Sequence, residues 1–162
     1  MVITIEIDKF KITKVLVDQG SSMDILYWKN FKKMSIPKEN IQLYEEQIVG
    51  FSGERVDNRE YMDLYTSFGE EECLRKTIQI RYLLVNANTL YNVLLGRSSI
   101  NRLRAIVSTP HLAIKFPSTD DDIVTVHVDK KTAHECYVAS LKVEPTRRLY
   151  KIPPRGRSPD KR

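Results

Sequence analysis

Asp18 is the residue of this chain best placed to do chemistry, because its carboxylate follows a predicted buried strand and lies on a tight turn. Residues 15–17 form an apolar run, and Gly20, Ser21 and Ser22 follow as turn residues. A carboxylate beside a core strand needs several hydrogen-bond donors or a shifted pKa, and such groups are often functional. Residues 15–22 alone leave a second interpretation open, in which Asp18 only caps its own turn.

Other catalytic chemistries find little support in the sequence. A serine hydrolase elbow needs a glycine two residues before the nucleophile, and Ser21 is preceded at that position by Gln19. Residues 50–53 lie between predicted strands, whereas a phosphate-binding loop opens a helix. Metal-ligand spacing is also missing among His111, His127, His134, Cys73 and Cys136. We therefore expect no metal and no cofactor.

The composition predicts one domain followed by a linker. A chain of 162 residues with 41% hydrophobic residues can bury a single core. The net charge of +5 comes from the end of the chain, since residues 142–162 hold eight basic and two acidic residues and the remainder sums to −1. That segment is rich in proline and has little to bury. We expect a domain over residues 1–141 and a basic, Pro-rich, disordered linker over residues 142–162.

Features of secreted and membrane proteins are missing from the sequence. The two cysteines make no C-x-x-C motif, no Asn-x-Ser/Thr site occurs, and the first residues lack the pattern of a signal peptide. The apolar runs are too short to span a membrane. These observations favour a reducing intracellular setting, and we expect no membrane partner.

Alternating apolar residues predict a strand-rich chain with about ten strands and two or three short helices, an all-β class. The expected strands cover residues 3–7, 12–17, 41–49, 61–68, 76–85, 91–96, 105–108, 112–116 and 123–128. Short helices are expected over residues 24–34, 97–103 and 131–141. In the first of these, Asp24 would be a first-turn acid that suits the helix dipole. Residues 50–53 carry two glycines and predict a hairpin tip.

Four segments together resemble a known family. They are residues 15–27 around Asp18, residues 50–54, residues 91–97 and residues 105–112. They resemble the retropepsins, the aspartic proteases of retroviruses and long-terminal-repeat retrotransposons. Within that family, their sequences resemble the protease segment of plant-type gypsy-class Gag-Pol polyproteins. The similarity runs from about residue 2 to residue 141. It implies a retropepsin-like acid protease fold with closed, barrel-like sheets, a flap hairpin and one to three short helices.

The resemblance also implies a role for each motif. Asp18 would be catalytic, Gly20 would let the backbone turn, and the Ser21 hydroxyl would hydrogen-bond the carboxylate of Asp18. Leu94, Leu95 and Gly96 would pack beneath this loop as a scaffold. The flap that closes over substrate would consist of Gly50, Phe51, Ser52, Gly53 and Glu54.

Such an enzyme needs two carboxylates that share one proton, and the chain contains one such turn. The resemblance therefore implies a C2 homodimer with one Asp18 from each copy. The activity would be that of an aspartic endopeptidase. It would process an extended retrotransposon polyprotein, in a cytoplasmic particle or in the nucleus.

One position departs from the family. Gln19 stands where the retropepsins usually have Thr or Ser, whose hydroxyl bonds the opposing loop at the dimer axis. The longer glutamine must rebuild or weaken that contact. A non-catalytic dimerisation module with the same fold is therefore the alternative. A third hypothesis, weak nucleic-acid binding through the basic tail, predicts that truncation after Leu141 abolishes salt-sensitive RNA binding.

Overall fold

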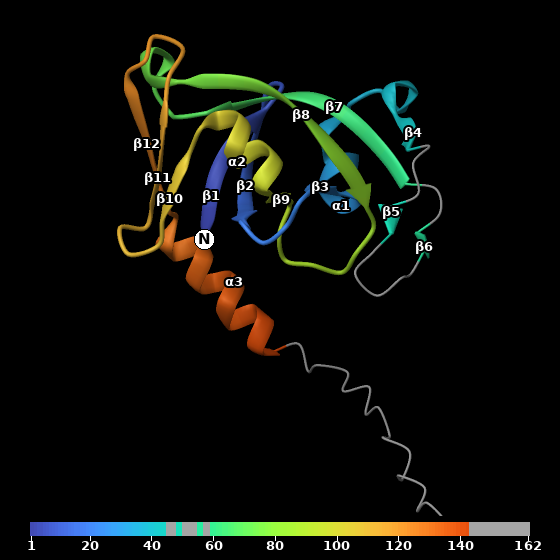
Figure 1. Cartoon of the computed structure of the whole chain (residues 1–162). Helices are drawn as coiled ribbons and strands as arrows, with labels where there is room; N and C mark the ends of the chain where they lie inside the picture. Colours follow the sequence, from blue (N-terminus) through green and yellow to red (C-terminus); the bar gives the residue numbers. More distant parts are fainter. Residues whose placement is uncertain (45–47, 50–54, 57–58, 143–162) are drawn as a thin grey trace, which may run out of the picture.

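The computed structural model describes residues 1–44, 48–49, 55–56 and 59–142 (Figure 1). Within these residues, six strands close into a barrel, because the first strand of the series also pairs with the last. In spatial order they are β1 (Val2–Ile7), β2 (Phe10–Val17), β9 (Val93–Leu95), β3 (Asp24–Tyr27), β8 (Lys76–Val85) and β7 (Arg59–Phe68). A short strand, β4 (Gln42–Tyr44), extends the sheet beyond β7.

Alternation along the strands builds the barrel core. In β1, Ile3, Ile5 and Ile7 are all buried, and the strand forms an antiparallel hairpin with β2. Strand β2 then pairs in parallel with β9, so that Val17 lies opposite Leu95. The ring of Tyr82 is fully buried in the core, and its hydroxyl forms a 2.8 Å hydrogen bond with Thr66. The loop after β2 is therefore fixed to a well-packed barrel.

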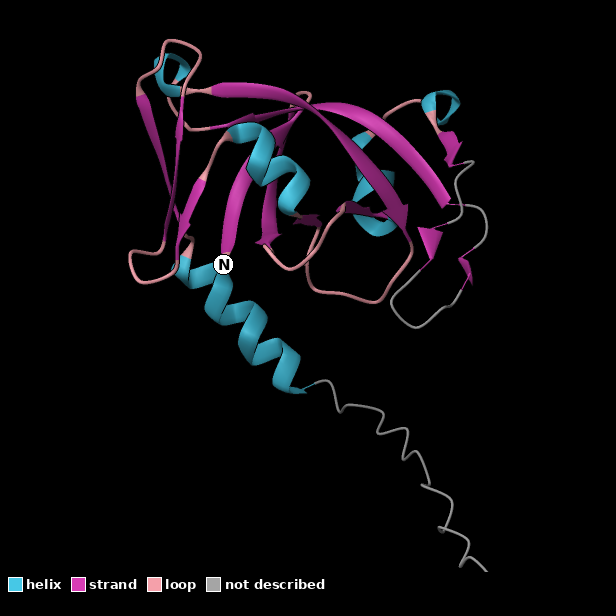
Figure 2. Cartoon of the chain, in the orientation of Figure 1, coloured by secondary structure: helices cyan, strands magenta, loops and turns pink. Residues whose placement is uncertain are grey.

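A second sheet packs against the barrel. It contains β10 (Ile106–Ser108), β11 (Ala113–Pro117) and β12 (Ile123–His127) in antiparallel order. Helix α2 (Arg97–Leu103) follows β9 directly, and its side chains line a small apolar cavity together with residues of the barrel and of this sheet. Figure 2 shows the three-stranded sheet at one side of the barrel and α2 beside it.

The remaining described elements are short, apart from the last helix. They are α1 (Trp28–Phe31), the 3-10 turns η1 (Lys32–Met34), η2 (Lys38–Asn40) and η3 (Glu72–Leu74), the strands β5 (Ile48–Val49) and β6 (Arg55–Val56), and α3 (Lys130–Lys142). Helix α3 contacts β1 and β2, and Cys136 is its buried residue. No helix of the described part is long and apolar enough to cross a membrane.

Most elements predicted from the sequence are confirmed, including the hairpin of β1 and β2, the long strands β7 and β8, and helix α2. The helix expected over residues 24–34 is wrong in its first part, because residues 24–27 form strand β3 between β8 and β9. Asp24 and Leu26 face the core in the two-residue period of a strand. The helix begins only at Trp28. The linker expected over residues 142–162 lies outside the described residues, except for Lys142, which ends α3.

Candidate active site

Asp18 is the first residue after β2, and its backbone continues the pairing with the neighbouring strand. Its N–H donates a 2.9 Å hydrogen bond to the carbonyl of Leu95. The chain then turns, and the N–H of Gly20 donates a 2.9 Å bond to the carboxylate of Asp18. Asp18 is half-buried, whereas Gln19 and Gly20 are exposed. The turn therefore presents a carboxylate with one fixed donor at the accessible end of a core strand.

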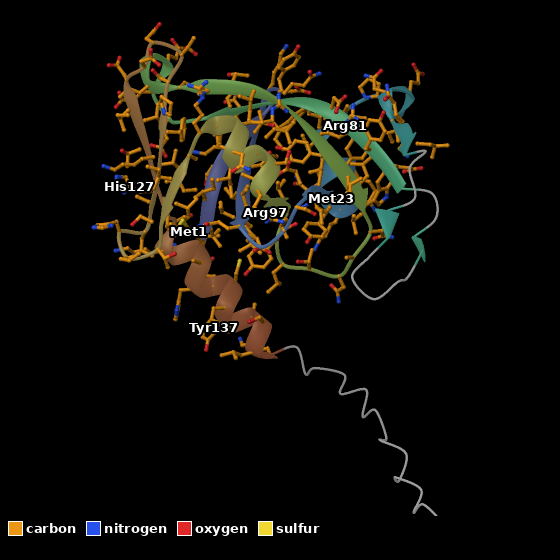
Figure 3. The ribbon with its side chains drawn as sticks, in the orientation of Figure 1. Met1, Met23, Arg81, Arg97, His127 and Tyr137 are labelled. Atoms are coloured by element: carbon orange, nitrogen blue, oxygen red, sulfur yellow. The ribbon has the colours of Figure 1, made fainter. Side chains whose placement is uncertain are left out.

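Three consecutive residues at the end of β9 hold this loop. Leu95 accepts the bond from Asp18, Gly96 donates a 2.8 Å bond to a carboxylate oxygen of Asp24, and Arg97 donates a 2.8 Å bond to the carbonyl of Ser21. Figure 3 labels Met23 in the loop and Arg97 at the start of α2. The predicted scaffold role of Leu94, Leu95 and Gly96 remains a prediction. Leu95 and Gly96 take part in these bonds, and Leu94 pairs with Leu16 of β2 and Ile25 of β3.

Gly96 lies so close to the loop that it has no room for a side chain. A Cβ atom at this position would lie 2.4 Å from the carbonyl oxygen of Met23 and 2.7 Å from that of Ser21. Both obstacles are backbone oxygens that accept hydrogen bonds, that of Ser21 from the Arg97 N–H and that of Met23 from the Ser21 hydroxyl. A glycine is therefore required here for close approach of two backbone segments.

Ser21 has a different partner from the one expected. Its hydroxyl donates a 3.0 Å bond to the carbonyl of Met23 and accepts a 3.3 Å bond from the N–H of the same residue. The hydroxyl thus stabilises the turn itself, as Ser does in many short turns. In this structure the donor to the Asp18 carboxylate is the N–H of Gly20. Ser22 is exposed and has no hydrogen bond among those described.

Asp24, predicted in the first turn of a helix, lies instead at the start of strand β3. Its side chain is buried, and burial raises the pKa of its carboxyl above the ordinary value. The Ser99 side chain, the Gly96 N–H and the charge of Arg102 each lower that pKa in part. The Ser99 hydroxyl is itself buried, and no partner among the described residues meets the usual hydrogen-bond geometry. No sequence signal placed Asp24 inside, because residues 25–27 are all hydrophobic and the segment does not alternate; its buried face follows from the pairing of β3 with β8 and β9.

The expected flap, Gly50 to Glu54, lies outside the described residues. Its two flanking segments are described, and β5 pairs antiparallel with β6 through Ile48 with Val56 and Val49 with Arg55. This pairing is the one that the arms of a hairpin make. Among the described residues, no group of three or more His, Cys, Asp or Glu side chains could hold a metal ion.

Comparison with known proteins identifies the fold. No family model and no curated protein matches this chain. Among solved structures, it is similar to the retroviral protease-like domain of Ddi1 from Leishmania major, with a TM-score of 0.52 and 9% identity over 77% of this chain and 91% of that one. A retropepsin-like aspartic protease from Rickettsia conorii matches with a TM-score of 0.49 and 15% identity, over 78% and 81% of the two chains. The similarity to the Ddi1 domain shows that the chain has the retropepsin-like fold.

Proposed function

We propose that this protein is an aspartic endopeptidase whose active site forms when two copies bring their Asp18 carboxylates together. The observation that carries the proposal is the position of Asp18, half-buried at the end of β2 in a loop that residues 95–97 hold by hydrogen bonds. The retropepsin-like fold supports it as well. The residues of the loop, Asp18 to Ser22, would then face the dimer axis.

The chemistry requires two carboxylates that share one proton. Like charges a few ångströms apart do not both ionise readily, so one Asp18 is protonated and the other ionised. The ionised carboxylate takes a proton from a bound water, whose oxygen attacks the peptide carbonyl carbon. The protonated one gives its proton to the carbonyl oxygen. When the tetrahedral intermediate collapses, the C–N bond breaks, the nitrogen receives a proton, and a carboxylic acid and an amine are released.

The second carboxylate must come from a second chain, because the sequence contains one Asp-x-Gly-Ser turn. A two-fold axis through the site satisfies this requirement. We infer that a monomer is inactive.

The proposed substrate is an extended linker of a retrotransposon polyprotein. The sequence resemblance to gypsy-class protease segments supports this choice. An extended peptide would add as a strand between the flap, Gly50 to Glu54, and the loop of Asp18, with main-chain hydrogen bonds providing affinity. In this proposal residues 1–141 are the protease, residues 142–162 link it to the next segment of the polyprotein, and processing occurs in the retrotransposon particle.

Gln19 supports a second candidate function. Its side chain is exposed on the turn, where the family usually places the short hydroxyl residue of the dimer contact. If glutamine prevents correct pairing of the loops, the chain is a non-catalytic dimerisation module of the same fold. This alternative keeps the dimer and loses the hydrolysis.

The test is cleavage of a fused polyprotein linker at mildly acidic pH over a series of protein concentrations. We expect the rate to rise faster than linearly with concentration, to fall by at least ~100-fold in Asp18→Asn, and to vanish with a statine-type transition-state analogue. Asp120→Asn, an exposed aspartate in a distant turn, is the matched control and should cleave normally.

No cleavage by a chain shown to be folded and dimeric would contradict the protease and support the non-catalytic module. Recovery of cleavage in Gln19→Thr would then identify glutamine as the cause of inactivity.

A further inference from the structure

A second aspartate, Asp24, lies beneath the loop that carries Asp18. Of the three hydrogen bonds from residues 95–97, those of Leu95 and Arg97 join backbone to backbone. The middle one joins the N–H of Gly96 to the side chain of Asp24, at 2.8 Å. Among these three described bonds, the one to Asp24 is therefore the one that involves a side chain.

The surroundings of Asp24 are those of a core residue. The side chain is 4% exposed, and its strand β3 is bracketed by β8 and β9. Tyr82 of β8 lies opposite it in the register and Arg102 of α2 acts on its charge, while β9 contributes only Val and Leu. Ser99 on α2 is 1% exposed, and its side chain acts on the Asp24 carboxyl to lower its pKa. Burying a polar group in such a place costs free energy unless its hydrogen bonds offset that cost.

We propose that Asp24 is a positioning residue, whose carboxylate holds Gly96 against residues 21–23 and thereby fixes the backbone that presents Asp18. This inference rests on the proposed protease function. A Cβ at Gly96 would lie within 2.7 Å of the carbonyl oxygens of both Ser21 and Met23, so Gly96 packs closely against the backbone of these two residues. Ser21 in turn bonds back to Asp18, because its N–H donates to the Asp18 carbonyl at 3.3 Å. A displacement of Gly96 would thus move the backbone of Ser21, and the bond from Ser21 would pass that movement to Asp18.

A purely structural role predicts something different. In that case, loss of the carboxylate lowers the stability of the fold, and the remaining folded enzyme works as before. A positioning role predicts a loss of kcat in the folded enzyme, with little change in KM, and recovery by any side chain that restores the acceptor for Gly96.

The experiment compares Asp24→Ala with Asp24→Asn, because asparagine keeps a carbonyl oxygen for the Gly96 N–H and alanine does not. Val124→Ala, at a buried position of β12 in the other sheet, is the control for lost stability alone. For each full-length variant, kcat and KM are measured at a temperature where it is folded. The Gly96 amide exchange rate and the pH titration of the Asp18 carboxyl carbon are measured by NMR.

We expect Asp24→Ala to lower kcat by roughly 10- to 100-fold, to speed exchange at Gly96 and to shift the titration of Asp18. Asp24→Asn should recover most of these losses, and Val124→Ala should produce none of them. If Asp24→Ala behaves like Val124→Ala in kcat and in the Asp18 titration, Asp24 is only structural and the inference is overturned.

The NMR readouts separate this inference from the proposed function. If the wild-type chain cleaves nothing, the protease proposal fails. A shift of the Asp18 titration in Asp24→Ala, recovered in Asp24→Asn, then still supports the positioning role. An unchanged titration overturns it.

Discussion

At the scale of single residues, the loop of Asp18 depends on positions that carry no reactive group. Gly96 gives two backbone segments room to approach, and Gly20 gives the N–H that binds the Asp18 carboxylate. The two glycines differ in what surrounds them. A Cβ at Gly96 would meet backbone at 2.4 Å, whereas a Cβ at Gly20 would meet the end of the Asp18 side chain at 3.1 Å.

We therefore expect Gly96→Ala to be much more destabilising than Gly20→Ala. Forcing a methyl group against fixed backbone costs about 1–3 kcal/mol or more, whereas a mobile side chain relaxes at a cost below ~1 kcal/mol. Urea denaturation of both variants measures the free energy of unfolding directly. Equal losses in the two variants would mean that the loop over Gly96 can move aside.

Asp24 makes the stability of the fold depend on pH. Burial raises the pKa of its carboxyl above 3.8, so between 3.8 and that higher value the folded state binds more protons than the unfolded state. The stability associated with the protonated group is complete below 3.8 and is lost as the pH rises through the folded pKa. Because asparagine has no proton to lose, Asp24→Asn should lose less stability than the wild type over this window.

Denaturation curves between about pH 3 and pH 7 test this expectation. Asp129→Asn is a control of opposite sign. Hydrogen bonds from the Thr132 side chain and backbone lower the pKa of Asp129, so its stabilising effect is lost as the pH falls through its folded pKa. If the stability of the wild type and of Asp24→Asn changed equally with pH, the raised pKa of Asp24 would be contradicted.

At the scale of elements, strand β8 organises the barrel, since it forms nine residue pairs with β7 and four with β3. Its Tyr82 lies opposite Met62 in the ladder, yet its hydroxyl reaches Thr66 four residues along β7. This buried bond joins the two long strands diagonally. Burial raises the pKa of Tyr82, so the phenol stays protonated.

A double-mutant cycle tests this bond. Tyr82→Phe leaves the Thr66 hydroxyl buried without its partner and should cost about 1–3 kcal/mol. The double variant Tyr82→Phe with Thr66→Val removes both polar groups, so much of that loss should be recovered. Free energies of unfolding for the two single variants and the double variant give the coupling. Additive losses would show that the hydroxyls do not depend on each other.

At the scale of the whole molecule, the fold consists of the barrel and the sheet of β10, β11 and β12 packed on it (Figure 1). Phe116 of β11 meets Phe68 of β7 edge-on, with ring centroids 6.0 Å apart. The backbone adds a further connection, because Asp129 donates a 2.9 Å bond to the carbonyl of Val2. The sheet is therefore anchored to the barrel and to its first strand.

Phe116→Ala should destabilise the whole molecule by about 3–5 kcal/mol, because the ring is buried where the two sheets meet. Ile123→Ala in the adjacent strand is the control. That side chain is 61% exposed, and we expect a change within about 0.5 kcal/mol. A single cooperative transition for the wild type by fluorescence and circular dichroism would show that the sheets unfold together. Two separate transitions would contradict this anchoring.

The sequence by itself determined the elements whose signal is local. The alternation in β1, β2, β7 and β8 predicted strands, and the glycine that closes residues 91–96 placed the start of helix α2 at Arg97. The resemblance singled out Asp18, Gly20, Leu95 and Gly96, and the structure brings these residues together. Their functional roles remain predictions.

Only the tertiary structure decided that residues 24–27 form a strand and that the Asp24 side chain bonds Gly96. Their apolar spacing is compatible with a helix, and an acid suits a first helical turn, so local physics favoured the wrong element. Pairing with β8 and β9 made the segment a strand, because both its edges found partners there. The bond of Asp24 to Gly96 spans 72 residues of sequence. A contact of that separation leaves no periodicity to read, since it exists only once the barrel has closed.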